Sequence, residues 1–217
     1  MQYSIDINID QNGVESINST GQKVTLVQSV VSNPPSSDIV AWLAFSPLES
    51  NLVSWEEEYY VYATTTEVQS GATIQMTSQT ESAAQLGWTY TFQNGIFTGA
   101  SGGEDTAYNA NNQQGGTYGM GLAQYAMVNN VQTFAPLSVV DVLNNETADF
   151  TPEIQLSIFL SASQDNGSVI SQVAGNAYSF TLSSSSPSIS LDFNDTSNTF
   201  YPATSEVSFS RRLRARS

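Results

Sequence analysis

Apolar and polar residues alternate one by one along most of this chain, and this period-2 pattern constrains its fold more than any other feature. In the first ten residues, Tyr3, Ile5, Ile7 and Ile9 alternate with polar side chains. Successive side chains of a β-strand point to opposite faces, so each such segment is expected to form a strand with one buried face. Only residues 81–86 are expected to form a helical turn, and no amphipathic helix is predicted.

Turn signals divide these segments at regular intervals. Asn12-Gly13 and Asn94-Gly95 predict two-residue hairpins of type I′, because both turn residues must adopt positive φ. Asp165-Asn166-Gly167 predicts a third hairpin turn. About twelve short strands, with turns every eight to twelve residues, predict an all-β fold, specifically an antiparallel β-sandwich of jelly-roll type.

No linker divides the chain, so residues 1–210 are predicted to form a single β-sandwich domain. The segment 99–116 is rich in Gly, Asn and Gln and is predicted to be a long loop, either functional or disordered. The segment 211–217 contains Arg211, Arg212, Arg214 and Arg216 and is predicted to be a disordered C-terminal tail.

The charge of the chain excludes one class of partner. The sequence has 20 acidic residues and 5 basic ones, and four of the basic residues lie in the Arg-rich segment. Residues 1–210 therefore contain a single cation, Lys23, which is expected to be a solvated strand residue. Such an acidic body repels phosphate groups, so nucleic-acid binding is not expected.

The absence of His and Cys excludes many catalytic mechanisms. A Ser-His-Asp triad, a Cys-His pair and an imidazole zinc site all need these residues. The carboxylates that remain include Glu56 and Glu58, which alternation places on one face of a long strand predicted over residues 53–66. Two carboxyl groups across a groove would suit glycoside hydrolysis, but three consecutive acidic residues at a strand start are more often a solvated edge.

No metal site or cofactor is predicted. The alternating oxygen ligands Asp6, Asn8, Asp10 and Asn12 resemble part of a calcium loop. In a 12-residue loop that starts at Asn8, however, the last position is Ser19 rather than the Glu that binds calcium there. No apolar stretch is long enough to predict a transmembrane span, and no signal peptide is recognised at the N-terminus. Localisation is therefore left open between the cytoplasm and release by a non-classical route.

Aromatic residues concentrate between residues 42 and 62 and again at 88–90. Tyr59 and Tyr60 must point to opposite faces of a strand, so at most one of them is expected to face the core. One exposed aromatic face is therefore predicted, because aromatic rings stack on sugars and also lie at lipid interfaces. The candidate ligand-binding residues are Trp55, Tyr59, Tyr60 and Trp88.

Three functional hypotheses follow from this composition. The first is a non-enzymatic, lectin-like binding protein whose exposed aromatic residues contact a glycan or another neutral polar ligand. The second is a membrane-active, cytolysin-like or self-assembling β protein, for which homo-oligomers are the expected partners. The third is a jelly-roll glycosidase with a carboxylate pair. Glycan binding, liposome leakage and loss of hydrolysis in Glu56→Gln or Glu58→Gln variants discriminate among the three.

Overall fold

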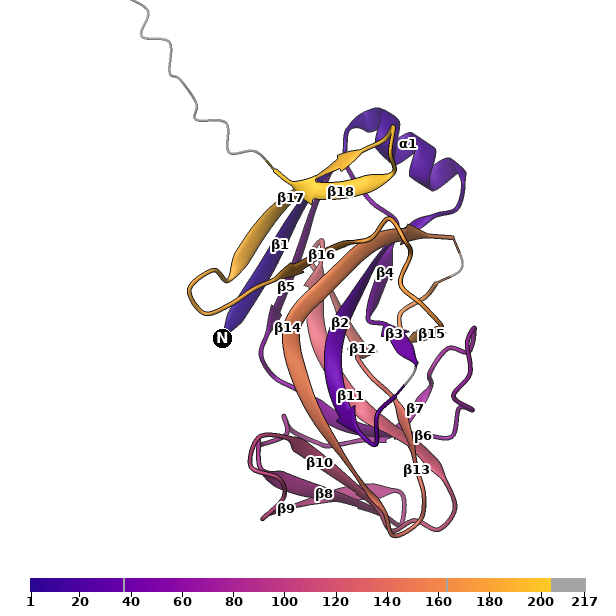
Figure 1. The fold of residues 1–217 in the computed structure, drawn as a ribbon, viewed down its shortest axis with the longest axis vertical. Helices are drawn as coiled ribbons and strands as arrows, with labels where there is room; N and C mark the ends of the chain where they lie inside the picture. The colour runs from indigo at the N-terminus through magenta and orange to yellow at the C-terminus, as the bar shows by residue number, and fades with distance from the viewer. Residues whose placement is uncertain (37, 163, 204–217) are drawn as a thin grey trace, which may run out of the picture.

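The computed structural model describes residues 1–36, 38–162 and 164–203. The predicted Arg-rich tail, 211–217, lies outside the described residues. Within them β-strands are the main secondary structure, beside one short helix, and they form three sheets (Figure 1). The all-β sandwich class predicted from the alternation is confirmed.

Sheet A, the largest, has nine strands. A path of seven strands runs across it, and two further strands pair with its long central strand. In spatial order the path is β18 (Thr199–Pro202), β17 (Ser188–Asn194), β1 (Gln2–Asn8), β5 (Ser50–Glu56), β11 (Tyr118–Val128), β6 (Tyr60–Thr64) and β7 (Met76–Gln79), and the additional partners of β11 are β12 (Val131–Pro136) and β13 (Val140–Val142).

Sheet B has seven strands and sheet C has two. Sheet B runs in the order β4 (Leu43–Phe45), β2 (Lys23–Asn33), β14 (Thr147–Ser161), β10 (Tyr108–Asn112), β8 (Trp88–Gln93) and β9 (Ile96–Ser101), with β16 (Tyr178–Thr181) also paired to β14. Sheet C pairs β15 (Ser168–Ile170) with β3 (Ile39–Ala41). The strands of the described residues are therefore more numerous than the sequence predicts, and β14 is longer than a short strand.

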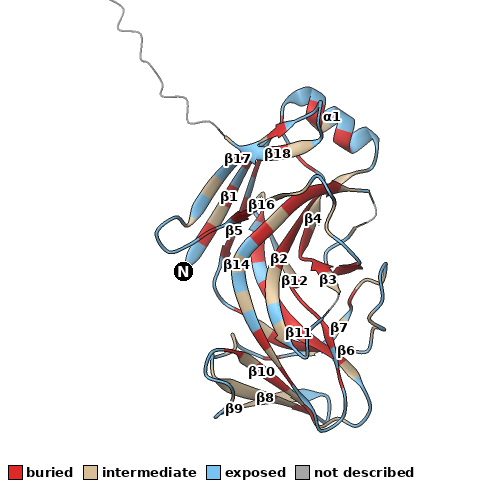
Figure 2. Cartoon of the chain, in the orientation of Figure 1, coloured by how far each residue is buried: buried red, intermediate tan, exposed pale blue. Residues whose placement is uncertain are grey.

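Sheets A and B enclose the main hydrophobic core. Buried side chains alternate with exposed ones along strands such as β1 and β14, as the period-2 pattern requires (Figure 2). The core contains residues from the inner faces of both sheets, among them Ile5, Leu122 and Phe150, and also Trp42, which lies between β3 and β4. Sheet C packs elsewhere: Val40 and Val169 contribute to a second, smaller cluster with Tyr62.

The expectation of purely antiparallel pairing is wrong for two strand pairs. β1 pairs with β17 in parallel, and β10 pairs with β8 in parallel. β1 and β17 come from opposite ends of the chain, and parallel neighbours need such long connections. The sheets are mixed, and this departs from an antiparallel jelly roll.

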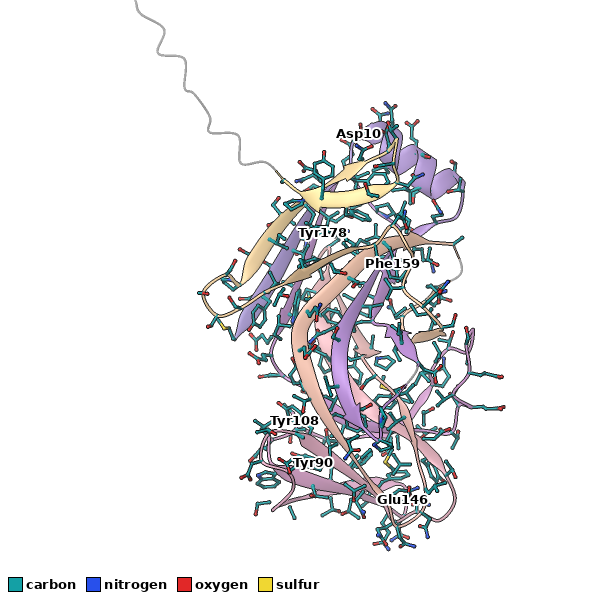
Figure 3. All side chains as sticks on the ribbon, in the orientation of Figure 1. Asp10, Tyr90, Tyr108, Glu146, Phe159 and Tyr178 are labelled. Carbon is teal, nitrogen blue, oxygen red and sulfur yellow. The ribbon has the colours of Figure 1, made fainter. Side chains whose placement is uncertain are left out.

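The first predicted hairpin is also wrong, because the chain forms helix α1 (Gln11–Ser19) there. Asp10 caps this helix: its side chain accepts a 2.7 Å hydrogen bond from the backbone N–H of Gly13. Gly13 fits this position because there is no room for a side chain, and not because the backbone needs a positive φ. A Cβ there would lie 2.8 Å from Cγ2 of Ile9. Figure 3 shows Asp10 beside α1, at the opposite end of the molecule from Tyr90 and Tyr108.

The hairpin at Asn94-Gly95 is confirmed, with φ of 53° and 80° at its two turn residues. The turn after Asp165 also forms, but the strand that follows it, β15, pairs with β3 and not with the strand before it. A hairpin that was not predicted joins β11 to β12 through Asn129-Asn130, where φ is 50° and 66°.

The Gly- and Asn-rich segment 99–116 is not one long loop. It contains the end of β9 and the whole of β10. The buried amide of Asn109 holds the intervening chain, because it donates to the Trp88 carbonyl at 2.9 Å and accepts from the Glu104 N–H at 3.1 Å. The amide side chains that suggested a loop thus satisfy buried backbone groups.

Candidate functional site

The candidate site begins with a break in one predicted strand. Residues 53–66 form two strands, β5 and β6, which pair one after the other with the same side of β11. The break falls at Glu57, whose place in the alternation would direct a carboxylate into the core. Burying an unpaired carboxylate is costly, so the chain leaves the sheet there. Glu57 is exposed, and its Oε2 accepts a hydrogen bond from the Tyr3 hydroxyl at 3.4 Å.

Local hydrogen bonds stabilise this break. The N–H of Glu58 donates to the Glu56 carbonyl at 2.8 Å, which folds the chain into a tight turn. The buried side chain of Gln124, on β11, also donates from Nε2 to the Glu56 carbonyl, at 2.8 Å. A side-chain amide therefore replaces the ladder hydrogen bonds that β11 loses between its contacts with β5 and β6.

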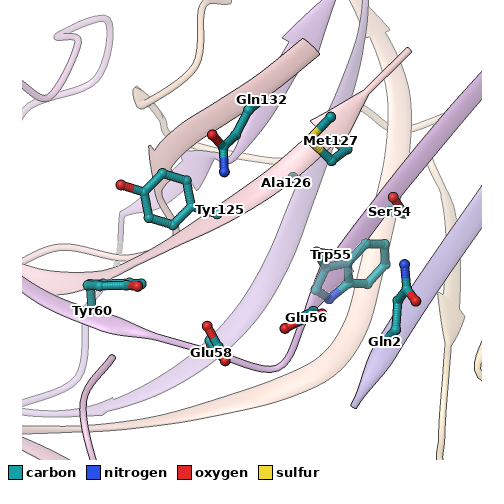
Figure 4. A pocket seen from close by; sticks show the side chains of 10 residues that line it. All are labelled: Gln2, Ser54, Trp55, Glu56, Glu58, Tyr60, Tyr125, Ala126, Met127 and Gln132. Carbon is teal, nitrogen blue, oxygen red and sulfur yellow. The ribbon is translucent and has the colours of Figure 1, made fainter. Parts of the chain in front are cut away.

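A groove of about 390 Å³ lies above this break, on the outer face of sheet A (Figure 4). Strands β1, β5, β6, β11 and β12 and the turn between β5 and β6 contribute side chains to it. The residues that line it are Gln2, Ser54, Trp55, Glu56, Glu58, Tyr60, Tyr125, Ala126, Met127 and Gln132.

Tyr60 and Tyr125 provide the aromatic part of the groove. Tyr60 is half-buried and Tyr125 is 38% exposed, and their ring centroids are 5.4 Å apart in a T-shaped arrangement. Phe134 on β12 packs behind both rings, 4.4 Å from Tyr125 and 5.4 Å from Tyr60. The three rings support one another, so two phenol rings are held at the groove with little freedom to reorient.

The polar part of the groove consists of carboxylates and amides that have no hydrogen-bond partner among the described residues. Glu56 and Glu58 are exposed, and neither carboxylate accepts a hydrogen bond from any described residue. The side-chain amides of Gln2 and Gln132 likewise form no hydrogen bond with the described part of the chain. Donors and acceptors of both kinds are therefore available to a ligand.

Burial raises the pKa of the Tyr60 phenol above its ordinary value, and the neighbouring charge of Glu58 raises it further. Both causes keep the hydroxyl neutral at physiological pH, so Tyr60 can donate a hydrogen bond as well as accept one. The influence of Glu58 also indicates that this wall of the groove is electrostatically negative.

The structure separates the four aromatic residues singled out in the sequence. Tyr60 lines the groove, whereas Tyr59 points into the core, as opposite faces of a strand require. Tyr59 is 1% exposed, its hydroxyl accepts a bond from Gln28 Nε2 at 3.4 Å, and burial raises its pKa. The expectation of an exposed face is therefore not met at Tyr59.

The two tryptophans do not offer an exposed stacking face in the groove either. Trp55 borders it but is only 3% exposed, because its ring stacks on Tyr3 and meets Trp42 edge to face. Trp88 is half-buried on β8 in sheet B, stacks on Tyr90 and does not line the groove. Packing against other rings removes much of the apolar surface of both tryptophans from water.

Tyr125 is the functional candidate that the sequence pattern did not single out. It lies on β11, in a segment with several small residues. Tyr125 and Met127 are two residues apart, so the alternation predicts that both point to the same face of a strand. This was the sequence signal that could have identified Tyr125. That face is the outer one in the structure, and both side chains are 38% exposed.

A second groove, of about 310 Å³, provides a useful contrast. It lies between the end of β14 and β15 and is lined by residues that include Phe159, Val169, Ile170 and Ala174. None of its lining residues is charged, and its aromatic ring, Phe159, is only 4% exposed. It lacks the combination of exposed rings and unpaired polar groups found beside Tyr60.

Comparisons of this chain with protein families, curated proteins and solved structures gave no match. Among the described residues, no helix is long and apolar enough to cross a membrane. No group of three or more acidic side chains in the described ranges is arranged to hold a metal ion. The chemistry of the groove is therefore the basis for assigning a function.

Proposed function

We propose that this chain is a non-enzymatic carbohydrate-binding protein and that the groove beside Tyr60 and Tyr125 binds a glycan. The observation that supports this proposal is the combination, in one groove, of two supported phenol rings with carboxylates and amides that bond no described residue. Sugars present apolar C–H faces and hydroxyl groups, so they need aromatic surface and hydrogen-bonding side chains together.

Each part of the groove has a role in this proposal. The rings of Tyr60 and Tyr125 stack against the apolar face of a sugar. The carboxylates of Glu56 and Glu58 accept hydrogen bonds from its hydroxyls, and the amide of Gln132 both donates and accepts. A volume of about 390 Å³ lies within the range of small-molecule sites, which suits a short glycan segment.

The groove also contains two carboxylates, so hydrolysis is the second function to test. A glycosidase needs one carboxyl group that stays protonated, and such a group normally lies in apolar surroundings. Glu56 and Glu58 are both exposed, which favours binding over catalysis. If the protein releases reducing ends from a bound glycan and Glu58→Gln abolishes this release, the result would support glycoside hydrolysis instead of binding alone.

The experiment is a glycan array followed by calorimetry on the strongest ligand. Tyr125→Ala and Tyr60→Ala are each expected to weaken binding about tenfold, which corresponds to about 1.4 kcal/mol, because each removes a stacking ring. Tyr201→Ala is the matched control: Tyr201 is 41% exposed, similar to Tyr125, but it lies on edge strand β18 away from the groove. Unchanged array profiles for both groove variants would contradict the proposal.

The membrane-active alternative remains a prediction and has its own assay. Leakage from zwitterionic liposomes at protein concentrations that give no array signal would favour it over glycan binding.

A further inference from the structure

The carboxylates of the groove have no counter-charge within the described part of the chain. Lys23 is the only basic side chain among the described residues, and it forms an ion pair with Asp165 away from the groove. No ion pair among these residues joins the Met1 amino group to Glu56 or Glu58. A cation that enters the groove is therefore attracted by carboxylates whose charge no described basic side chain offsets.

The three consecutive glutamates are not equivalent. The Glu57 carboxylate already accepts a hydrogen bond from Tyr3, whereas the carboxylates of Glu56 and Glu58 line the groove without a donor from residues 1–36, 38–162 and 164–203. Figure 4 shows the Glu58 side chain between those of Tyr60 and Glu56. A ligand in the groove would therefore meet two unpaired carboxylates on the same wall.

The aromatic rings favour the same kind of ligand. A cation within about 6 Å of a phenol ring is attracted by the negative face of the ring. Tyr60 and Tyr125 form one part of the groove beside Glu58, so the rings and the carboxylates act on the same space. Burial is the main cause of the raised Tyr60 pKa, and the charge of Glu58, the next cause, is consistent with this arrangement.

The remaining lining residues distinguish a sugar amine from a simple ion. Gln2, Gln132 and Ser54 supply neutral donors and acceptors around the carboxylates, and these suit the hydroxyls of a sugar ring. A bare metal ion would instead need three or more converging oxygen or nitrogen ligands. No such acidic group occurs in the described ranges.

We infer that the groove selects glycans that contain a free, protonated amino group, with the ammonium held by Glu56 and Glu58 beside the rings of Tyr60 and Tyr125. This inference rests on the proposed glycan-binding function and adds the chemical class of the sugar. An ammonium offers three donors and a full positive charge, so it forms charge-assisted hydrogen bonds with carboxylates and leaves donors for the neutral groups beside them. An N-acetylated sugar offers neither the charge nor those donors.

The test compares two oligosaccharides of the same length and linkage, the β-1,4 trimers of glucosamine and of N-acetylglucosamine, by calorimetry on the full chain. The glucosamine trimer is expected to bind at least about tenfold more tightly at a pH where its amines are protonated. Its affinity is expected to fall as salt is raised, while that of the neutral trimer stays constant.

Variants separate the groove from the general acidity of the surface. Glu56→Gln and Glu58→Gln are each expected to reduce the preference for the amine several-fold. Glu57→Gln removes the same charge from the adjacent residue, which does not line the groove, and is expected to keep most of the preference. Melting curves check that all three variants fold, as expected for exposed positions.

Each outcome decides one of the two claims. Equal loss in all three Gln variants would mean diffuse attraction to an acidic surface and would overturn the inference. Tighter binding of the N-acetylated trimer, with loss in Tyr125→Ala, would overturn the inference but support glycan binding. Absence of binding by either trimer and by every array glycan would overturn the proposed function as well.

Discussion

Tyr60 and Tyr62 lie two residues apart on the same strand and the same face of sheet A, yet their surroundings are opposite. Tyr62 is fully buried, and its hydroxyl donates to the Ser138 carbonyl at 2.7 Å. Tyr60 is half-exposed at the groove, and its hydroxyl has no partner among the described residues. Residues of sheet C, including Val40 and Val169, pack against Tyr62, and the outer face beside Tyr60 is left open.

The difference shows how one sheet face can serve both stability and binding. Over Tyr62 the face is closed by Val40, Ile74 and Val169, which form a small second core. Beside Tyr60 the same face keeps its rings and polar groups accessible. Phe134 links the two halves, because it packs against this second core and also contacts the rings of Tyr60 and Tyr125.

The largest expected effect comes from closing the space between β11 and the segment after β12. A Cβ on Gly121 would lie 1.8 Å from the Ser138 carbonyl oxygen, a clash that only backbone movement can relieve. Gly121→Ala is therefore expected to cost about 3 kcal/mol or more in the free energy of unfolding, measured by urea denaturation.

Gly175→Ala is the control for that substitution, since nothing lies within 4 Å of its Cβ position. Its effect is expected to be within about 0.5 kcal/mol, as for ordinary surface substitutions. Equal stability of the two variants would show that the covered half is not closely packed at Gly121.

Removing one hydroxyl from each tyrosine tests the comparison directly. Tyr62→Phe leaves the buried Ser138 carbonyl without this donor and is expected to cost about 1–3 kcal/mol. Tyr60→Phe removes a hydroxyl that bonds no described residue and is expected to change the free energy of unfolding by less than about 0.5 kcal/mol. Similar losses in both variants would contradict the assignment of one residue to stability and the other to the groove.

The smallest expected effect concerns the titration of Tyr60. Burial and then the negative charge of Glu58 raise the pKa of this phenol above its ordinary value of 10.0. Glu58→Gln removes the charge but not the burial, so the pKa should fall part of the way back and phenolate should form at lower pH. Burial alone raises the Tyr62 pKa, so it should not respond. A phenolate titration by NMR that finds no change at Tyr60 would show that Glu58 does not act on the groove wall.

Much of the local structure was predictable from residue patterns. The alternation correctly assigned Tyr59 to one face and Tyr60 to the other, and Asn94-Gly95 correctly predicted a hairpin. The pattern failed where another local interaction competed with it. At Asn12-Gly13 the Asp10 cap and the buried Ile17 favour a helix over a turn.

The candidate site was predictable only in part. The alternation favoured an exposed aromatic face and placed Glu56 and Glu58 together, and both glutamates line the groove with Tyr60. Trp55 met the same sequence criteria but is buried. Tyr125 lies 65 residues from Tyr60 in the sequence, and only the pairing of β6 with β11 brings the two rings within 5.4 Å.

The order of residues along the chain determined that this protein is built from β-strands, which side chains share a face, and that its body is acidic. These properties depend on neighbours a few residues away, so a single sequence contains them. Tertiary structure decided which face is covered and where a strand breaks open. Sheet C packs over the half of sheet A that contains Tyr62 and leaves the half beside Tyr60 open. Its strands, β3 and β15, come from distant parts of the chain, so no local sequence pattern shows which half they cover.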